Sequence, residues 1–122
     1  METVIGKVDY KLVPKGWGYE KIFWNDDKYC GKLLFIAKAR KCSWHYHNIK
    51  DETFYIQKGE VYVFFGSNDD PFYAKNVILK QGDVFHVPPG LRHQMQAVTD
   101  TYLFEFSTHD EDSDSIRVIK GD

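Results

Sequence analysis

The chain has 122 residues, of which 43% are hydrophobic and 16% aromatic, so it holds enough apolar material for one packed core and too much for a disordered protein. Its 16 Lys and Arg residues face 18 Asp and Glu residues, a balance that lacks the broad basic surface of a nucleic-acid-binding protein. No run approaches the roughly 20 apolar residues of a membrane span, and the N-terminal residues lack the apolar stretch of a secretory signal, so we expect one cytoplasmic domain over residues 1–122 with no membrane or nucleic-acid partner.

Short segments rich in β-branched and aromatic residues alternate with turn residues along the whole chain. In chain order the strand-like segments are residues 33–37, 53–56, 61–65, 84–87 and 101–106. The turn signals are residues 25–27, 58–59, 66–71, 81–83 and 88–90. No window of helical length shows an apolar stripe with the 3.6-residue period. The sequence therefore predicts an all-β protein, built as a double-sheet jelly roll or a small barrel.

Two histidines lie two residues apart in a segment with strand character. Side chains alternate along a strand, so His45 and His47 point to the same face and Tyr46 points to the other. A turn over residues 48–51 then returns the chain, and Glu52 opens the next strand. Its carboxylate is thereby expected to meet the two imidazoles.

A fourth candidate ligand, His93, must come from a different hairpin. The tight turn of Pro88, Pro89 and Gly90 precedes it and is suited to deliver it to the others. Three imidazoles and one carboxylate suit a divalent transition metal such as Mn, Fe, Co, Ni, Cu or Zn, and four protein ligands leave positions open on a five- or six-coordinate ion. The alternative is a set of surface histidines with a solvated acid, but it does not account for the four residues occurring in phase.

These spacings resemble the two conserved motifs of the cupin superfamily. The first motif reads His45-x-His47-x4-Glu52-x6-Gly59, and the second reads Gly82-x5-Pro88-x-Gly90-x2-His93. Two positions depart from the family pattern: Ala39 replaces a leading glycine, and Ala97 replaces a final asparagine. The resemblance implies the cupin double-stranded β-helix, a jelly-roll barrel, with the four named residues as metal ligands.

Both ends of the chain carry a narrower resemblance, to the type II mannose-6-phosphate isomerase group. The segment Lys15-Gly-Trp17-Gly18-Tyr-Glu20 is similar to that group's opening Pro-Trp-Gly, with Gly16 in place of the proline. The segment from Glu105 to Arg117 is similar to its Glu-Val-Ser-Thr ending. This resemblance implies a sugar or sugar-phosphate isomerase that transfers a proton through an enediolate. Two alternatives keep the same ligand set: a metallo-cupin that binds a small ligand without turning it over, and an iron-dependent dioxygenase.

An isomerase needs a base, and Glu105 is the candidate. Its strand places Leu103 and Glu105 on one face and aromatic residues on the other. A carboxylate on the inner face is costly without a partner, so Glu105 is expected to be either a metal-proximal base or a paired structural acid. The sequence does not separate these two roles.

Three further residues are candidates for substrate binding. Arg117 and Arg92 offer guanidinium donors for a phosphate or for sugar hydroxyls, and the alternative for each is an ordinary surface arginine. Trp17 offers a flat ring for a sugar, although a tryptophan is first of all a core residue. The expected ligand is a small molecule, most simply a carbohydrate.

Three remaining features have simpler interpretations. The high aromatic content predicts a homodimer that buries a spare apolar sheet face. Cys30 and Cys42 are expected to be reduced core thiols rather than a disulfide. The acidic run over residues 110–114 is expected to be a solvated turn.

Overall fold

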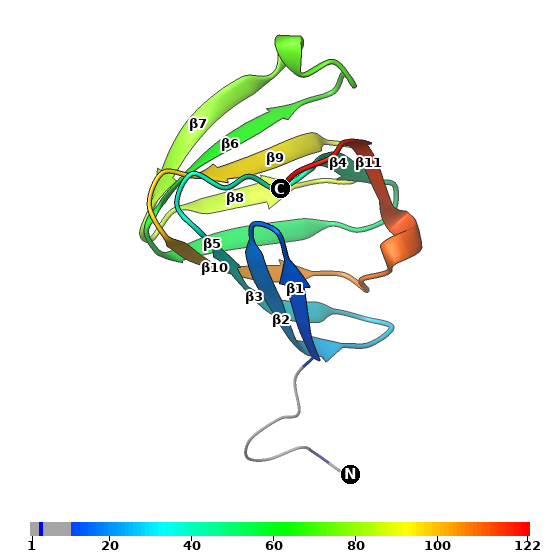
Figure 1. The fold of residues 1–122 in the computed structure, drawn as a ribbon. Coiled ribbons are helices and arrows are strands. Elements are labelled where there is room, and N and C mark those ends of the chain that lie inside the picture. Colours follow the sequence, from blue (N-terminus) through cyan, green and yellow to red (C-terminus); the bar gives the residue numbers. More distant parts are fainter. Residues whose placement is uncertain (1–2, 4–10) are drawn as a thin grey trace.

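The computed structural model describes residue 3 and residues 11–122, and these fold into two antiparallel sheets (Figure 1). The first sheet has six strands in the order β1 (Lys11–Lys15), β2 (Gly18–Asn25), β3 (Cys30–Ile36), β10 (Thr101–Ser107), β5 (Glu52–Lys58) and β8 (Val84–Val87). The second has five, in the order β11 (Ser115–Ile119), β4 (Trp44–His47), β9 (Arg92–Ala97), β6 (Glu60–Gly66) and β7 (Lys75–Lys80). Two short 3-10 turns, η1 (Pro71–Tyr73) and η2 (Asp112–Asp114), complete the described elements.

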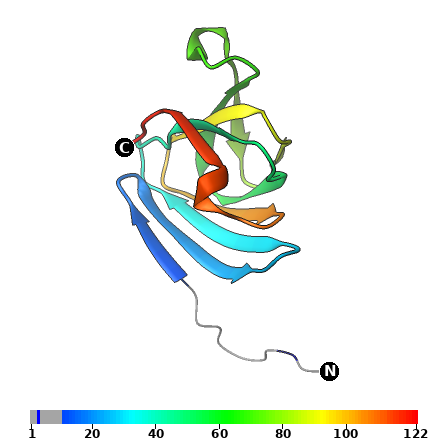
Figure 2. The same cartoon turned by 90° about the vertical axis from the view of Figure 1, so that its right-hand side faces the viewer.

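The predicted all-β jelly roll is confirmed, and each strand-like segment of the sequence lies in or at the end of a strand. The sheets curve around one interior, as the view in Figure 2 shows, but they do not close into a barrel. Each sheet keeps two free edges among the described strands, β1 and β8 in one and β11 and β7 in the other. The architecture is therefore an open sandwich of two sheets.

Alternation along the strands decides which side chains fill this interior. In β3 and β10 the inward residues Leu34, Ile36 and Leu103 are buried, whereas Tyr102 and Phe104 lie on the outer face. Core residues from both sheets, among them Val61, join one cluster. Glu105 follows the same alternation and faces inward, beside the core.

Two turn positions have the left-handed backbone that favours glycine. Gly59, which closes the first motif, has φ +100°, and a Cβ atom there would lie 2.4 Å from the carbonyl oxygen of Asp100. Ala39 has φ +68° and is the one non-glycine residue with positive φ among the described residues. This conformation gives a physical reason for the glycine that cupins often carry at the position of Ala39.

Two further expectations concern the membrane and the cysteines. Within the part of the chain that the structure describes, no helix has the length and hydropathy needed to cross a bilayer. Cys30 and Cys42 are buried and unpaired, as predicted. Burial raises the pKa of the Cys30 thiol to about 11, so this group is an unreactive core residue.

Candidate metal centre

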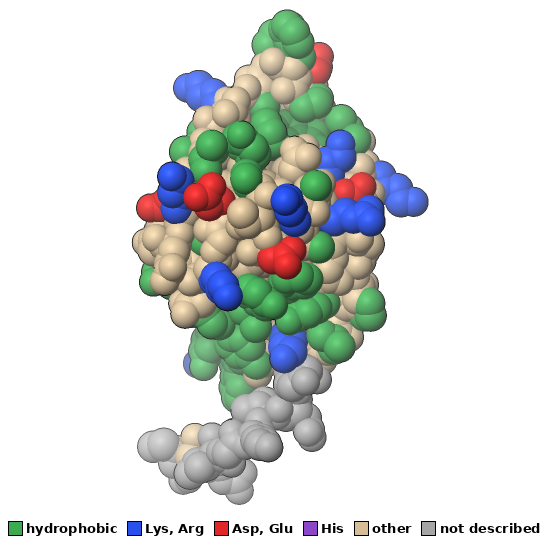
Figure 3. All heavy atoms as spheres, turned by 60° about the vertical axis from the view of Figure 1, so that its left-hand side comes forward, with side chains coloured by type: hydrophobic (Ala, Val, Ile, Leu, Met, Phe, Trp, Pro, Cys, Tyr) green, Lys and Arg blue, Asp and Glu red, His purple; other side chains and the backbone are tan. Residues whose placement is uncertain are grey.

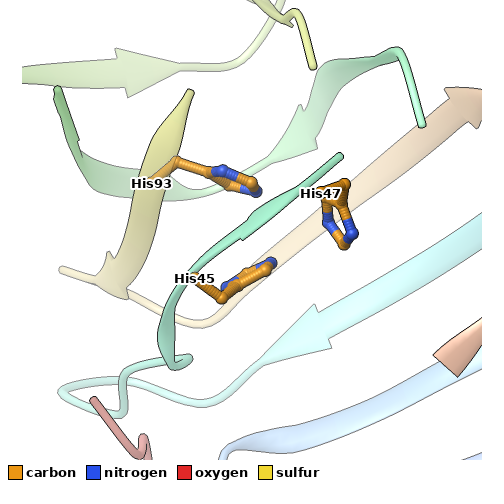
Figure 4. A group of neighbouring side chains, drawn as sticks. All are labelled: His45, His47 and His93. Atoms are coloured by element: carbon orange, nitrogen blue, oxygen red, sulfur yellow. The ribbon is translucent and has the colours of Figure 1, made fainter. Parts of the chain in front are cut away.

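Three imidazoles converge on one point of the interior (Figure 4). His45 and His47 project from the same face of β4, and His93 projects from the neighbouring β9, directly opposite His45 in the sheet register. One nitrogen from each ring lies within 4.8 Å of those of the other two. The ring centroids of His45 and His93 are 4.3 Å apart, and those of His45 and His47 are 5.0 Å apart. The structure thus assembles the histidine set that the sequence spacing predicts.

Each imidazole is held by a backbone carbonyl at its other nitrogen. The Nδ1 atoms of His45, His47 and His93 lie 2.9, 3.0 and 2.9 Å from the carbonyl oxygens of Ser43, Asp114 and Leu91. A carbonyl only accepts, so in each ring Nδ1 carries the hydrogen and Nε2 presents a lone pair. This tautomer is the one in which Nε2 is able to bind a metal, and the carbonyl fixes the direction of the ring.

The carboxylate of Glu52 lies against two of these imidazoles. Its Oε1 is 3.2 Å from His93 Nε2, and its Oε2 is 3.4 Å from His47 Nε2. Neither His93 Nε2 nor Glu52 Oε2, although both are buried, has a partner with hydrogen-bond geometry. The ammonium of Lys50 is 2.9 Å from Oε2, but this contact is an ion pair without the direction of a hydrogen bond.

A bound cation would remove the repulsion between the facing acceptors of His93 and Glu52. With the hydrogen on Nδ1, the lone pair of His93 Nε2 faces a carboxylate oxygen, which is also an acceptor, and two buried acceptors in contact repel unless a proton or a cation lies between them. Burial lowers the pKa of His45 well below its usual range and also lowers the pKa of His47, so both rings are neutral ligands at neutral pH. Burial raises the pKa of Glu52, but the contact with His93 and the charge of Lys50 outweigh it and hold the carboxyl ionised. The residues therefore fit a divalent transition metal.

The acidic run that the sequence presents as a solvated turn instead supports this centre. Asp114 is buried in η2, and its carboxylate accepts from the backbone N–H groups of Asn48 and Lys50 at 2.9 Å and of Ile49 at 3.1 Å. Its carbonyl receives the Nδ1–H of His47. Asp114 thus clamps the loop between β4 and β5 and orients one imidazole. The expectation of a solvated turn is corrected at this residue, because three convergent N–H donors compensate a buried carboxylate.

Two buried lysines, which belong to neither sequence motif, lie between the imidazoles and β10. The ammonium of Lys50 contacts three carboxylates: Glu52 Oε2 at 2.9 Å, Glu105 Oε2 at 3.1 Å and Asp110 Oδ1 at 2.9 Å. The ammonium of Lys32 contacts Asp110 Oδ2 at 3.0 Å, Glu20 Oε1 at 3.4 Å and Glu105 Oε2 at 4.0 Å. Burial lowers the pKa of Lys50, but the charges of Glu105 and Glu52 outweigh it and raise the pKa above its usual range. Both lysines stay protonated, and we call this group of six residues the ion network.

Glu105 is part of this network. It contacts both lysines and also accepts a hydrogen bond from the hydroxyl of Ser107 at 3.1 Å. Burial and the negative charge of Glu52 raise its pKa, against the effect of the two ammonium groups. Glu105 is therefore a paired acid that is connected through Lys50 to the carboxylate beside the imidazoles.

A cavity of about 250 Å³ opens beside the imidazoles, and it brings several predicted residues together. Its lining includes His45, His47, Glu52, Glu105, Trp17 and Arg117. Arg117 pairs with His45 across the β11–β4 ladder, and Trp17 is a buried core residue whose ring reaches the cavity wall. The same cavity is thus lined by three of the four candidate ligands, the candidate base and two of the three candidate substrate contacts, whereas His93 is not among its lining residues.

Arg92 does not lie in this cavity. Because it precedes His93 on β9, alternation directs it to the opposite face of the sheet. There its guanidinium stacks at 3.6 Å on the ring of Tyr46, and its Nε donates to Asp69 Oδ1 at 2.9 Å. The structure therefore places Arg92 apart from the other candidate substrate residues.

Comparison with known proteins places this sandwich in a family. A family model described as Cupin matches residues 37–120, which is more than half of the chain. The chain therefore belongs to the cupin family. A comparison with curated protein sequences finds no match.

Solved structures share the fold at low sequence identity. CapF, a capsular polysaccharide assembling protein from Staphylococcus aureus, aligns with a TM-score of 0.77 and 16% identity over 89% of this chain and 34% of its own. Oxalate decarboxylase from Bacillus subtilis aligns with a TM-score of 0.75 and 15% identity over 95% of this chain and 33% of its own. KdgF from Halomonas sp. aligns with a TM-score of 0.71 and 17% identity over 86% of this chain and 91% of its own. The chain thus spans about a third of the length of CapF and oxalate decarboxylase, and these likenesses concern the fold.

Proposed function

We propose that this cupin is a metal-dependent isomerase that acts on a sugar or a sugar phosphate by transfer of a carbon-bound proton. The observation that carries the proposal is that two imidazoles of the converging cluster, those of His45 and His47, line one cavity together with the buried carboxylate Glu105. His45, His47 and His93, with Glu52, are the proposed ligands of a divalent Mn, Fe, Zn, Ni or Co ion. The ion, when bound, supplies Lewis-acid stabilisation of negative charge on substrate oxygens.

The side chains of the protein supply the proton transfer in this proposal. Glu105 Oε2 is the proposed base, because its raised pKa favours the protonated form that a carboxylate takes after it removes a proton. Lys50, 3.1 Å away, fixes the position of this oxygen and keeps a positive charge beside it. Trp17 and Arg117, on the cavity wall, are the proposed contacts for the body of the sugar. The carbohydrate link of CapF, a polysaccharide-assembling protein of the same fold, agrees with this substrate class.

Solvent exchange tests the proposal. Metal-loaded protein in D₂O is incubated with a panel of aldoses, ketoses and their phosphates, and deuterium at the carbon next to the carbonyl is measured by NMR. We expect exchange that is lost in Glu105→Gln and retained in Glu60→Gln, a matched change outside the cavity. Full exchange by Glu105→Gln removes Glu105 as the base, and no exchange with any sugar removes the isomerase.

One observation favours a second function, that of a metallo-cupin that binds a small ligand without turnover. Glu105 is held by two ammonium groups and a hydroxyl, which is the environment of a structural acid. This function predicts a ligand-dependent rise in melting temperature with no exchange. Consumption of oxygen by the iron-loaded protein instead identifies the dioxygenase.

The outer face of the six-stranded sheet supports the proposed homodimer. Its aromatic side chains include Tyr19, Phe35 and Tyr102. The ring of Phe35 contacts the other two rings in tilted arrangements, with centroid distances of 5.3 Å to Tyr19 and 4.9 Å to Tyr102. Phe106, on the same face, is 55% exposed. Hydrophobic side chains also gather over the lower part of the face drawn in Figure 3. Sedimentation analysis that finds only a monomer at high protein concentration contradicts the dimer.

A further inference from the structure

We infer that the cavity selects a neutral, unphosphorylated monosaccharide over a sugar phosphate or a nucleotide-linked sugar. The inference rests on the proposed carbohydrate-binding function of the same cavity and narrows its substrate class. Three observations carry it: the size of the cavity, the way its buried cations are already paired, and the excess of hydrogen-bond acceptors on its wall.

The cavity is small. Its volume of about 250 Å³ lies below the roughly 300–1,000 Å³ of sites that hold drug-sized ligands. A single six-carbon sugar is of the right size for such a space. A nucleotide-linked sugar is several times larger and has to leave most of its mass outside.

The buried cations are not free to receive a phosphate. Lys50 is in contact with three carboxylates and Lys32 with three, so both buried ammonium groups are already paired. A phosphate dianion placed there would break buried ion pairs and approach Glu105 and Asp110, which is strongly unfavourable at low dielectric. A neutral ligand leaves the ion network intact.

The wall of the cavity instead offers acceptors. Four carboxylates, those of Glu20, Glu52, Glu105 and Asp110, face three ammonium groups, those of Lys15, Lys32 and Lys50, so oxygen lone pairs outnumber the donors. Sugar hydroxyls are donors of suitable number and reach. The lining also includes the apolar side chains of Trp17, Phe54 and Met95, which suit the C–H face of a pyranose.

The remaining lining is mixed in charge. Arg117 and Lys120 also line the cavity. Three carboxylates, those of Glu111, Asp112 and Asp122, line the cavity with them. The whole lining has seven carboxylates and five cationic side chains, so even with a divalent ion bound the cavity has no net positive charge for a dianion.

Binding measurements on metal-loaded, dialysed protein test this selectivity at about physiological ionic strength, where surface charges are screened beyond about 8 Å. D-mannose and D-fructose are titrated against mannose 6-phosphate and fructose 6-phosphate by calorimetry. We expect at least one neutral sugar to bind at least about tenfold more tightly than its phosphate. Tighter binding of the phosphates, or binding of neither neutral sugar, overturns the inference.

A charge-neutralising variant tests the cause. Glu20→Gln releases one partner of Lys32, so we expect it to narrow the preference for the neutral sugar by severalfold. Glu60→Gln, at the first residue of β6 beside Lys80 and outside the cavity, is expected to leave the preference unchanged. An unchanged preference in Glu20→Gln contradicts the role of the paired lysines. Binding of neutral sugars without deuterium exchange contradicts the isomerase proposal but agrees with this inference. Exchange confined to the sugar phosphates agrees with the isomerase proposal but contradicts this inference.

Discussion

His47 is oriented from the far end of the chain by Asp114: its Nδ1–H donates to the Asp114 carbonyl at 3.0 Å, while the Asp114 carboxylate accepts from the loop that follows His47. The two residues are 67 positions apart in sequence. The centre therefore depends on a residue that contributes no ligand.

Replacing Asp114 tests this dependence. Asp114→Ala removes the acceptor for the N–H groups of Asn48, Ile49 and Lys50, so we expect the loop to loosen and metal affinity to fall by about 10- to 100-fold. Asp114→Asn keeps one acceptor oxygen and is expected to be intermediate. Asp112→Asn, at an exposed position of the same turn, is the matched control, and the measurement is competition with a chromophoric chelator. Wild-type affinity in Asp114→Ala contradicts the clamp.

Ionised Asp110 makes part of the free energy of unfolding depend on pH in the acid range. Burial raises the pKa of Asp110, but the ammonium groups of Lys50 and Lys32 outweigh it and lower the pKa from 3.8 to about 2. The folded pKa is lower than the unfolded one, so the stabilisation of about 2 kcal/mol is complete above about pH 4 and is lost as the pH falls to about 2. We expect Asp110→Asn to lower the free energy of unfolding at pH 7 and to flatten its decline over this window in urea titrations. If the free energy of unfolding of the wild type and of the variant declines equally between about pH 4 and pH 2, Asp110 is not the source of this pH dependence.

Alanine substitutions at two glycines with similar φ but different surroundings distinguish the cost of backbone strain from the cost of steric overlap. Gly59 and Gly82 have φ of +100° and +91°, but only at Gly59 would an added methyl group meet other atoms, at 2.4 Å from the Asp100 carbonyl oxygen. We expect Gly82→Ala to cost about 1 kcal/mol and Gly59→Ala to cost clearly more, roughly 3 kcal/mol. If denaturant unfolding gives the same loss of free energy of unfolding for both variants, the close approach of Asp100 does not contribute to the cost.

Replacement of Ala39 by glycine is expected to stabilise the protein. A φ of +68° destabilises an alanine by roughly 1–2 kcal/mol, and a glycine at this position is free of that strain. Part of the gain is lost, because a glycine makes the unfolded chain more flexible and so raises the entropy cost of folding. We therefore expect Ala39→Gly to raise the free energy of unfolding by about 0.5–1 kcal/mol. Ala37→Gly, two residues earlier, lacks the positive φ and is expected to be destabilising. A loss of stability in Ala39→Gly contradicts this account.

The sequence predicts the parts of the site that follow from strand parity. His45 and His47 share a face because they are two apart, and the same rule, applied to His93, directs Arg92 away from the cavity. Parity also carries a signal that the two motifs do not contain: Lys32 alternates with Leu34 and Ile36 and is therefore an inward lysine.

Other features depend on contacts that no local pattern contains. The clamp by Asp114 joins η2 to the loop after β4, and nothing in an acidic run distinguishes a residue that meets three N–H donors from one that meets water. Likewise, the two lysines that pair with Glu105 come from β3 and from the β4–β5 loop, so no pattern within its own strand predicts these partners.

Metal binding by variants of the imidazole cluster tests the central claim most directly. Metal-free protein is titrated with Mn²⁺, Co²⁺ and Zn²⁺, and bound metal is counted by elemental analysis after dialysis. We predict about one divalent ion per chain in the wild type. Affinity is expected to fall by at least about 100-fold in His45→Gln and His93→Gln, whereas His86→Gln, at an exposed histidine paired with Asp51, binds as the wild type does. No uptake by the wild type, or wild-type affinity in His45→Gln and His93→Gln, contradicts the account.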